Sequence, residues 1–218
     1  MQKLKIEHTS YITHDVKRFL LEKPKDFIYA PGTAARFSIN KPGWEDKKRP
    51  FTFTSLNNWP QLELIVKIYE DHNGVTNEMA KLEVGDELIM HEVFDTINYK
   101  GKGIFIAGGT GITPFIAIFR ALYQSNNIKN HVLLYSNHTQ YDIILGGELH
   151  QMLGDAFLNV FTKQGVIGFK ERRIDRDFLI EHIKDFSVQF YVCGPKDFTE
   201  EITNALVGLG ATPESVHV

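Results

Sequence analysis

The sequence predicts a two-domain protein: a six-stranded antiparallel β-barrel followed by an α/β domain built on a parallel sheet. In residues 1–98, short runs of mixed apolar and polar residues are separated by Gly, Pro and Asn turns, which is typical of small antiparallel barrels. From residue 103 onward, apolar strand patterns alternate with helical patterns, which indicates a parallel sheet with helices on both faces. A polar stretch with glycine at 98–102 separates the two patterns. We therefore expect domains at residues 1–98 and 99–218.

The six strands of the first domain are expected from local patterns of side-chain polarity. Residues 51–55 alternate strictly and place Phe51 and Phe53 on one face. A short helix capped near Thr76 is expected between the last two strands, with an N-cap by Thr76 itself as the ordinary interpretation of this helix start. The expected strands cover residues 4–7, 16–21, 34–39, 51–55, 62–69 and 87–91.

The second domain is expected to contain four strands, four helices and a closing edge strand. Its strands are apolar and short, as in sheets that are buried on both faces. The expected strands cover residues 103–107, 131–136, 158–161, 190–193 and, at the edge, 215–218. The expected helices cover residues 115–123, 142–153, 176–183 and 196–209.

Composition excludes several classes of function. The chain has 218 residues, a net charge of -3 and 43% hydrophobic residues, so neither nucleic acid nor an anionic membrane is an expected partner. Its single cysteine, Cys193, excludes an intrachain disulfide and cannot by itself hold an iron-sulfur cluster. The histidines lack metal-ligand spacing, and no metal site is expected. No apolar segment has the length of a signal-peptide core or a membrane span, and a cytoplasmic location is expected. The oligomeric state is left open.

The segment Gly-Gly-Thr-Gly-Ile-Thr-Pro at residues 108–114 organises the second domain. It joins an apolar strand to an apolar helix. Glycines at such a turn let the backbone approach a ligand closely, and N–H groups at a helix start face an anion. Pro114 suits a first helical turn. A tight turn without a ligand explains these glycines equally well, so the rest of the chain must decide.

Three segments meet at one edge of the predicted parallel sheet. They are the glycine loop at 108–113, the segment at 136–138 and Cys-Gly-Pro at 193–195. Each follows a strand, and in open parallel sheets ligands bind at the carboxyl ends of the strands. Their coincidence indicates a ligand site.

Four ordered motifs resemble those of the ferredoxin-NADP reductase superfamily, and the similarity covers nearly the whole chain. They are Arg-Pro-Phe-Thr at 49–52, Gly-Val-Thr at 74–76, the glycine loop at 108–114 and Cys-Gly-Pro at 193–195. The similarity is greatest to the bacterial flavodoxin or ferredoxin reductase branch and to oxygenase reductase components. It implies an N-terminal flavin-binding barrel and a C-terminal domain for a nicotinamide nucleotide.

The resemblance assigns the first two motifs to a flavin. Arg49 would contact the flavin pyrophosphate, as suits a guanidinium. Phe51, at the position of the family's tyrosine, would stack on the ring without a hydroxyl contact, and Thr52, the candidate catalytic residue, would hydrogen-bond near flavin N5. The implied flavin contacts are Arg49, Pro50, Phe51, Thr52, Gly74, Val75 and Thr76. Lys67 and Tyr69, on one face of their strand, are weaker candidates by position, because exposed strand positions commonly carry Lys and Tyr without a ligand.

The remaining motifs are assigned to the nicotinamide nucleotide. The glycine loop would bind its pyrophosphate, and Cys193 would pack beside the nicotinamide as a small apolar group without nucleophilic chemistry. The implied nucleotide contacts are Gly109, Thr110, Gly111, Thr113, Pro114, Ser136, Cys193, Gly194 and Pro195.

The expected cofactors are FAD and a reduced nicotinamide nucleotide. FAD is favoured over FMN because the start of a helix at residues 74–76 suits a diphosphate. NADH is favoured over NADPH because residues 136–138 offer no guanidinium for a 2′-phosphate, although Lys163 follows the next strand. The family's C-terminal aromatic that covers the flavin is replaced here by residues 215–218, which contain no aromatic side chain of that kind.

We therefore expect a flavoprotein that takes a hydride from NAD(P)H and passes electrons to a separate carrier. Ferredoxin, flavodoxin and an oxygenase component are the expected acceptors. Two alternatives stay open: a free-flavin or ferric-siderophore reductase, and a flavin-binding regulatory or assembly subunit without catalysis.

Overall fold

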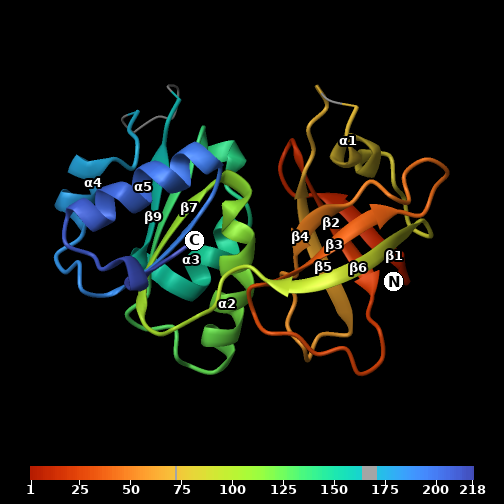
Figure 1. Cartoon of the computed structure of the whole chain (residues 1–218), viewed down its shortest axis with the longest axis horizontal. Helices are drawn as coiled ribbons and strands as arrows, with labels where there is room; N and C mark the ends of the chain where they lie inside the picture. The colour runs from red at the N-terminus through yellow and green to blue at the C-terminus, as the bar shows by residue number, and fades with distance from the viewer. Residues whose placement is uncertain (72, 164–170) are drawn as a thin grey trace.

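Two separate β-sheets organise the computed structural model, which describes residues 1–71, 73–163 and 171–218. One sheet is antiparallel and six-stranded, and the other is parallel and five-stranded. They form two lobes that lie side by side, with the N-terminal lobe on the right of Figure 1 and the C-terminal lobe on the left. The predicted fold class is confirmed.

The antiparallel sheet curls around an apolar core. Its strand order, β4-β3-β6-β1-β2-β5, places β4 and β5 at the two edges. A bridge between Phe53 and Leu64 joins the chain just beyond β4 to β5, so the curled sheet closes on itself. The strands are β1 (Gln2–Tyr11), β2 (Val16–Glu22), β3 (Thr33–Ile39), β4 (Arg49–Thr52), β5 (Gln61–Lys67) and β6 (Glu87–Asp95).

The helix α1 (Val75–Ala80) lies between β5 and β6, as predicted, but its expected cap is wrong. The N-cap residue is Gly74, in an extended conformation, and no side chain caps the helix. Thr76 already lies inside the first turn, where its hydroxyl is too far along the helix to serve as the N-cap.

Helices cover both faces of the parallel sheet, as predicted. Its strand order is β11-β10-β7-β8-β9. One face packs against α2 and α3, and the other against α4 and α5. The strands are β7 (Gly103–Gly108), β8 (Val132–Asn137), β9 (Phe157–Phe161), β10 (Gln189–Cys193) and β11 (Val216–His217), and the helices are α2 (Thr113–Gln124), α3 (Gly146–Leu153), α4 (Arg176–His182) and α5 (Lys196–Gly208).

The helix α3 begins later than predicted. The 3₁₀ turn η2 (Gln140–Asp142) occupies the start of the predicted range. Leu145, with φ of 51°, then sets the chain in a left-handed conformation directly before α3. A residue in this conformation cannot continue an α-helix, so η2 and α3 are separate elements.

The strand order reverses between β7 and β10. β7 pairs with β8 on one side and with β10 on the other, so the loops after β7 and β10 lie next to each other. In open parallel sheets this is the place where nucleotides bind.

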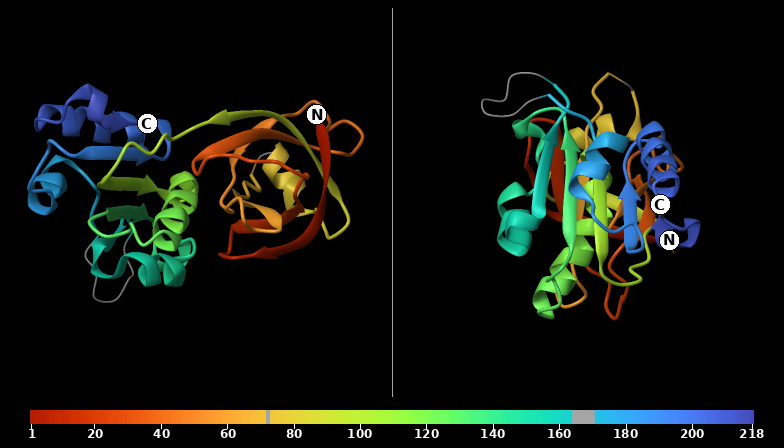
Figure 2. Two further views of the ribbon diagram at one scale, coloured as in Figure 1. Left: turned by 90° about the horizontal axis from the view of Figure 1, so that it is seen from below. Right: turned by 90° about the vertical axis from the view of Figure 1, so that its left-hand side faces the viewer.

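The helix α2 lies at the junction of the two lobes (Figures 1 and 2). Its apolar residues share one buried cluster with Val16 and Ile65 of the barrel and with Ile97 of the connection between β6 and β7. The predicted domain boundary between residues 98 and 99 falls within this connection, which runs from the end of β6 to the start of β7, and it stays a prediction. No helix in the described ranges is long and apolar enough to cross a membrane.

Candidate functional site

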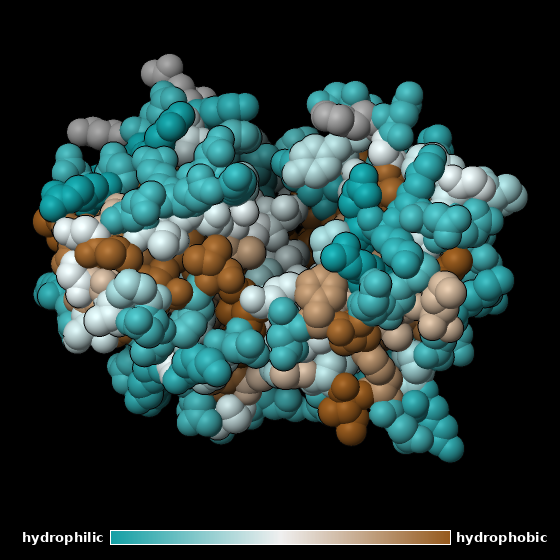
Figure 3. All heavy atoms as spheres, in the orientation of Figure 1, coloured by the Kyte–Doolittle hydropathy of each residue, from teal (hydrophilic) through white to brown (hydrophobic). Residues whose placement is uncertain are grey.

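A cleft of about 460 Å³ opens between the two lobes at the switch point of the parallel sheet. Asp15, Val16, Lys67 and Tyr69 of the barrel line one side. The other side is formed by residues at the carboxyl ends of the parallel strands, including Gly108, Gly109, Thr110, Ser136, Asn137, His138, Thr162, Arg173 and Pro195. The face of the molecule seen in Figure 3 is largely hydrophilic, with apolar side chains gathered in smaller patches.

The glycine loop forms a 3₁₀ turn, η1 (Gly109–Ile112), that leads directly into α2. Gly109 has φ of +53°, and a Cβ atom there would meet no atom within 4 Å. Its backbone is therefore accessible from the cleft. The Thr113 hydroxyl donates a hydrogen bond to the Thr110 carbonyl at 3.0 Å, which closes the turn. Pro114 occupies the first turn of α2, as predicted.

Gly111 packs directly on the chain that follows β10. A Cβ atom at this position would lie 2.2 Å from the Cys193 carbonyl oxygen and 2.6 Å from the Gly194 nitrogen. Both atoms belong to the backbone and cannot swing aside. The two predicted nucleotide-binding segments thus touch through their main chains, and only glycine fits between them.

Phe198 of α5 supports both segments from below, a role that the sequence motifs did not reveal. A Cβ atom on Gly194 would lie 2.7 Å from the Phe198 Cδ1 atom, and one on Gly108 would lie 3.1 Å from it. The absence of side chains at these two glycines therefore lets the ring fit beneath the loops.

Tyr135 and Asn137 of β8 were also missed. The Tyr135 hydroxyl donates a hydrogen bond to the Gly109 carbonyl at 3.0 Å, and burial raises the pKa of this phenol far above its usual range. Tyr135 thus remains a donor. The Asn137 carboxamide is buried, and neither of its polar atoms has a hydrogen-bond partner in the described ranges. An unpaired buried amide at a cleft is suited to a polar ligand.

Cys193, at the end of β10, is half-buried and carries a neutral thiol. Burial raises the pKa of this thiol to about 11. A thiol that stays protonated at neutral pH is a poor nucleophile, which supports the predicted packing role.

The predicted flavin strand, β4, lies at the sheet edge. Arg49 and Pro50 are exposed, and Phe51 and Thr52 are half-buried. Among the described residues, the Arg49 side chain donates only to the neighbouring Lys48 carbonyl, at 2.8 Å. The Phe51 ring packs near Phe37, with centroids 6.3 Å apart. Among the described residues the Thr52 hydroxyl has no hydrogen-bond partner. The strand thus offers a guanidinium, a ring and a free hydroxyl to a flavin.

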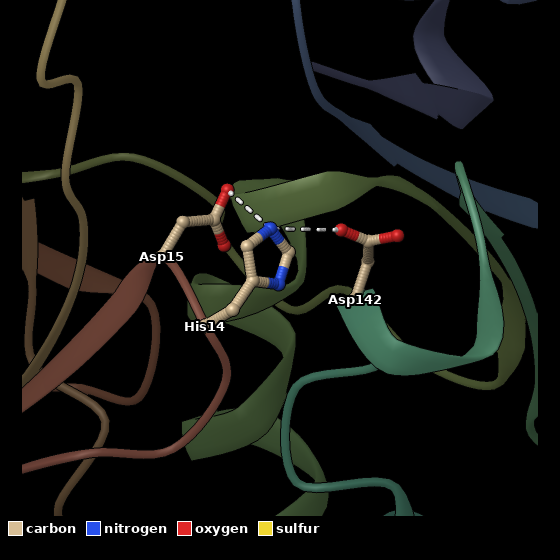
Figure 4. Close-up of side chains that lie close together, drawn as sticks. All are labelled: His14, Asp15 and Asp142. Carbon is tan, nitrogen blue, oxygen red and sulfur yellow. Dashed lines mark ion pairs between the residues drawn. The ribbon is translucent and has the colours of Figure 1, made fainter.

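A cluster of His14, Asp15 and Asp142 joins the lobes beside the cleft (Figure 4). The His14 imidazole lies between the two carboxylates, 3.6 Å from Asp15 and 3.9 Å from Asp142. Asp15 also pairs with Lys67 at 2.7 Å, and Asp142 accepts hydrogen bonds from Thr139. Because both carboxylates already have partners, we interpret the cluster as a contact between the lobes.

The cleft brings together part of the predicted site. Lys67 and Tyr69 face the glycine loop across it, although they were only weak candidates from sequence. The predicted residues that line the cleft are Lys67, Tyr69, Gly109, Thr110, Ser136 and Pro195. Gly111, Thr113, Pro114, Cys193 and Gly194 are not among its lining residues but belong to the segments that form its floor.

The structure does not place the other predicted flavin contacts in this cleft. Residues 49–52 and 74–76 lie on the barrel outside its lining. Conversely, Arg173 lines the cleft. Sequence patterns missed this residue because it lies in an irregular segment before α4 and belongs to no motif. Lys163 lies near His138, whose carbonyl accepts from the Lys163 amide at 3.0 Å.

The fold places a barrel opposite a parallel sheet, with the cleft between them at the switch point of that sheet. Residues 105–204 match the family model described as the oxidoreductase NAD-binding domain. That stretch is similar to NAD-binding oxidoreductase domains, and the two-domain fold is the one found in a ferredoxin NADP+ reductase of known structure.

Curated relatives match most of this chain in sequence. NADH-cytochrome b5 reductase 1 of Eremothecium gossypii is 32% identical over 182 residues, which cover 74% of this chain and 62% of the relative. The glycine betaine monooxygenase reductase subunit of Chromohalobacter salexigens is 25% identical, over 94% of this chain and 60% of the relative. The chain thus spans less than two thirds of the length of both.

Solved structures confirm the fold over the whole chain. The FAD/NAD-binding domain of a nitric oxide dioxygenase from Vibrio cholerae superposes with a TM-score of 0.86 at 19% identity, covering 99% of this chain and 96% of that one. A ferredoxin NADP+ reductase from Neisseria gonorrhoeae with bound FAD and NADP gives a TM-score of 0.78 at 19% identity, covering 96% and 91%.

Proposed function

We propose that this protein is an NADH-dependent flavoprotein reductase that holds FAD on its barrel and passes electrons to a separate redox protein. One observation carries the proposal. A single cleft is lined by barrel residues with predicted flavin contacts, Lys67 and Tyr69, and by the glycine loop, Gly109 and Thr110. Cofactors bound at these two places would meet between the lobes.

The barrel residues fit a flavin. Arg49 has N–H groups free for a phosphate, and Phe51 presents a half-buried ring next to the unpartnered hydroxyl of Thr52. The start of α1 has no side-chain cap, which leaves its first N–H groups available near a diphosphate. A bound flavin supplies the ability to accept a hydride and release single electrons. The protein supplies orientation and shields the site from water.

The parallel sheet fits the nicotinamide nucleotide. The accessible backbone of Gly109 suits close approach of a pyrophosphate, and the neutral Cys193 thiol offers a small apolar surface beside a nicotinamide ring. The Asn137 carboxamide is available to a polar group of the nucleotide.

The names of the relatives favour a protein as the electron acceptor. The matched proteins include cytochrome b5 reductases and an oxygenase reductase subunit. We therefore propose a haem protein of the cytochrome b5 kind or an oxygenase component as the carrier, with ferredoxin and flavodoxin as further candidates. The chain has one cysteine, so an iron-sulfur centre would belong to another polypeptide or to a segment outside this sequence.

Anaerobic reduction of the purified protein tests the proposal. Its flavin, identified by chromatography, should be FAD, and NADH should bleach it in a stopped-flow mixing experiment. Subsequent addition of oxidised cytochrome b5 or ferredoxin should reoxidise the flavin. Retention of the yellow colour with excess NADH and NADPH would instead favour a subunit without catalysis. Turnover with free flavin alone would favour the flavin or siderophore reductase alternative.

NADPH is a second candidate because a guanidinium lies in the cleft. Arg173 lines the cleft together with His138, which follows β8, and Thr162, which follows β9. Dissociation constants of NADH and NADPH for the wild type and for Arg173→Gln distinguish the two cases. A 2′-phosphate contact predicts that Arg173→Gln weakens NADPH selectively, whereas NADH dependence predicts tighter NADH binding in both proteins.

A further inference from the structure

A buried guanidinium with partners in both lobes joins the two lobes. Arg120 of α2 is only 7% exposed, and its guanidinium reaches from the nucleotide domain into the barrel. It donates to the Thr54 carbonyl at 2.8 Å and to the Glu63 carboxylate at 2.5 Å. A buried cation of this kind is retained only with full partnering.

Arg120 lies between one carboxylate from each lobe. Glu63 belongs to β5 of the barrel and is 2% exposed. Glu148 belongs to α3 and accepts from Arg120 through both oxygens, at 2.5 and 2.8 Å. Burial acts to lower the pKa of Arg120, but the two carboxylates outweigh it and raise that pKa. The guanidinium therefore stays charged and fixed.

A barrel ring covers the same guanidinium. The guanidinium carbon of Arg120 lies 4.6 Å from the centroid of the Trp59 ring. Trp59 belongs to the loop between β4 and β5. A planar guanidinium held on its edge by two carboxylates and on its face by an indole has little rotational freedom.

Each end of this contact leads directly to a proposed cofactor segment. Thr54 lies two residues after Thr52, and its hydroxyl donates to the Glu63 carboxylate at 2.7 Å. Arg120 lies on the helix that begins with Thr113, immediately after the glycine loop. Two helical turns, or roughly 10 Å of rigid helix, thus connect the guanidinium to the loop.

Besides the longer His14–Asp142 contact at 3.9 Å, the lobes meet through an apolar contact that cannot fix their angle in the same way. It consists of apolar side chains such as Val16, Ile65 and Ile97 against α2. Apolar burial is non-directional, so such surfaces tolerate small rotations. Charged hydrogen bonds require particular distances and angles.

We propose that Arg120 is a positioning residue that sets the distance and angle between the nicotinamide and the flavin. In this proposal Arg120 touches neither cofactor. It acts by holding α2 against Thr54, just after β4, and against Glu63 of β5. This inference rests on the proposed function, since it assigns the flavin to residues 49–52 and the nucleotide to the glycine loop.

Arg120→Lys tests it in the flavin-loaded protein. Lysine keeps the positive charge beside Glu63. Its single ammonium group cannot donate to both oxygens of Glu148 and to the Thr54 carbonyl at the same time. We expect the dissociation constant of NADH to change less than twofold. The limiting rate of flavin reduction should fall by about tenfold to a hundredfold, because misplacing the reacting groups by about 1 Å lowers the rate on that order. The long-wavelength absorbance band that arises when a nicotinamide stacks on a flavin should weaken in parallel, because the two rings would be less well aligned.

Two further variants serve as partner and control. Glu148→Gln removes the fork while leaving the barrel bonds, and a smaller loss, about threefold to tenfold in rate, is expected. Lys41→Gln breaks an ion pair with Asp86 at 3.1 Å that lies within the barrel alone, and the rate should be unchanged. Dithionite, which acts without the nucleotide domain, should reduce all the proteins equally.

The outcomes separate this inference from the proposed function. If NADH fails to reduce even the wild-type flavin, the proposed function fails. If NADH reduces the wild type and both Arg120→Lys and Glu148→Gln at equal rates, the function stands and the positioning role is wrong. Where Arg120→Lys loses its flavin or its fold, the rate of Glu148→Gln decides in its place.

Discussion

The two proposed halves of the cofactor junction are built differently. The glycine loop of the second domain is held in place by other residues of the same domain. Gly111 packs against the Cys193 backbone, and the Tyr135 hydroxyl donates a hydrogen bond to the Gly109 carbonyl. The flavin strand β4 lies at a sheet edge, with Arg49 and Pro50 exposed. The proposed nucleotide site is thus held by contacts within the protein, whereas the proposed flavin site presents groups that a ligand would complete. Substitutions should disturb folding in the first region and cofactor chemistry in the second.

The largest effect is expected for Gly111→Ala. Its methyl group would lie 2.2 Å from the Cys193 carbonyl oxygen, and the backbone there must move. We expect a loss of about 3 kcal/mol in the free energy of unfolding, measured by urea denaturation, together with weaker NADH binding.

Gly147→Ala is the matched control for that substitution. Gly147 lies in α3, and a Cβ atom there would meet nothing within 4 Å. It should stabilise the protein by roughly 0.5–1 kcal/mol, as alanine does in a helix. Equal effects of the two substitutions would contradict the close main-chain contact.

Cys193 gives the next largest effect. Burial raises the pKa of its thiol to about 11, against about 8.5 for an unfolded chain. At pH 8 the folded protein should therefore react with iodoacetamide about a hundredfold more slowly than the protein unfolded in urea. Comparable rates in the two states would show that the thiol is accessible and ionised.

The same shift predicts how stability depends on pH. As pH rises from about 8.5 toward 11, the unfolded chain releases a proton that the folded protein retains. The folded state should lose stability over this window, and Cys193→Ala should lose less. Urea midpoints at pH 8 and pH 10 measure the difference.

The flavin half is tested by Thr52→Val. The Thr52 hydroxyl has no partner among the described residues, so its removal should leave stability within about 0.5 kcal/mol. The rate of flavin reduction by NADH should fall by about tenfold if the hydroxyl contacts the flavin near its reacting nitrogen. Unchanged reduction in stopped flow would remove Thr52 from the mechanism.

The smallest effect is expected for Tyr135→Phe. It removes the hydrogen bond to the Gly109 carbonyl while keeping the buried ring. A net loss of about 1 kcal/mol is typical for such a bond, and it corresponds to roughly fivefold weaker NADH binding. Unaltered binding, by calorimetry or fluorescence titration, would show that the loop holds its shape without this bond.

The sequence allowed much of this arrangement to be predicted. Alternation and apolar runs located the strands and helices within a few residues, because periodicity reports which face is buried. The glycine motif located the loop after β7 correctly. The predicted cap at Thr76 and the start of the helix at 142 were wrong because each boundary depends on the conformation of one residue, Gly74 or Leu145.

The supporting residues could not be predicted in this way. Tyr135, Phe198 and Arg120 belong to no motif, and each acts on a segment distant in the chain. Only the folded arrangement shows that Arg120 meets Thr54 or that Phe198 lies beneath two glycines. Such contacts are set by tertiary packing, about which local patterns carry little information.

The anaerobic mixing of the purified yellow protein with NADH tests the central claim most directly. If the cleft joins a flavin on the barrel to a nucleotide on the glycine loop, the yellow absorbance of the oxidised flavin should disappear on mixing and return when an oxidised carrier is added. A protein that binds flavin but keeps its colour with excess NADH and NADPH would contradict the account.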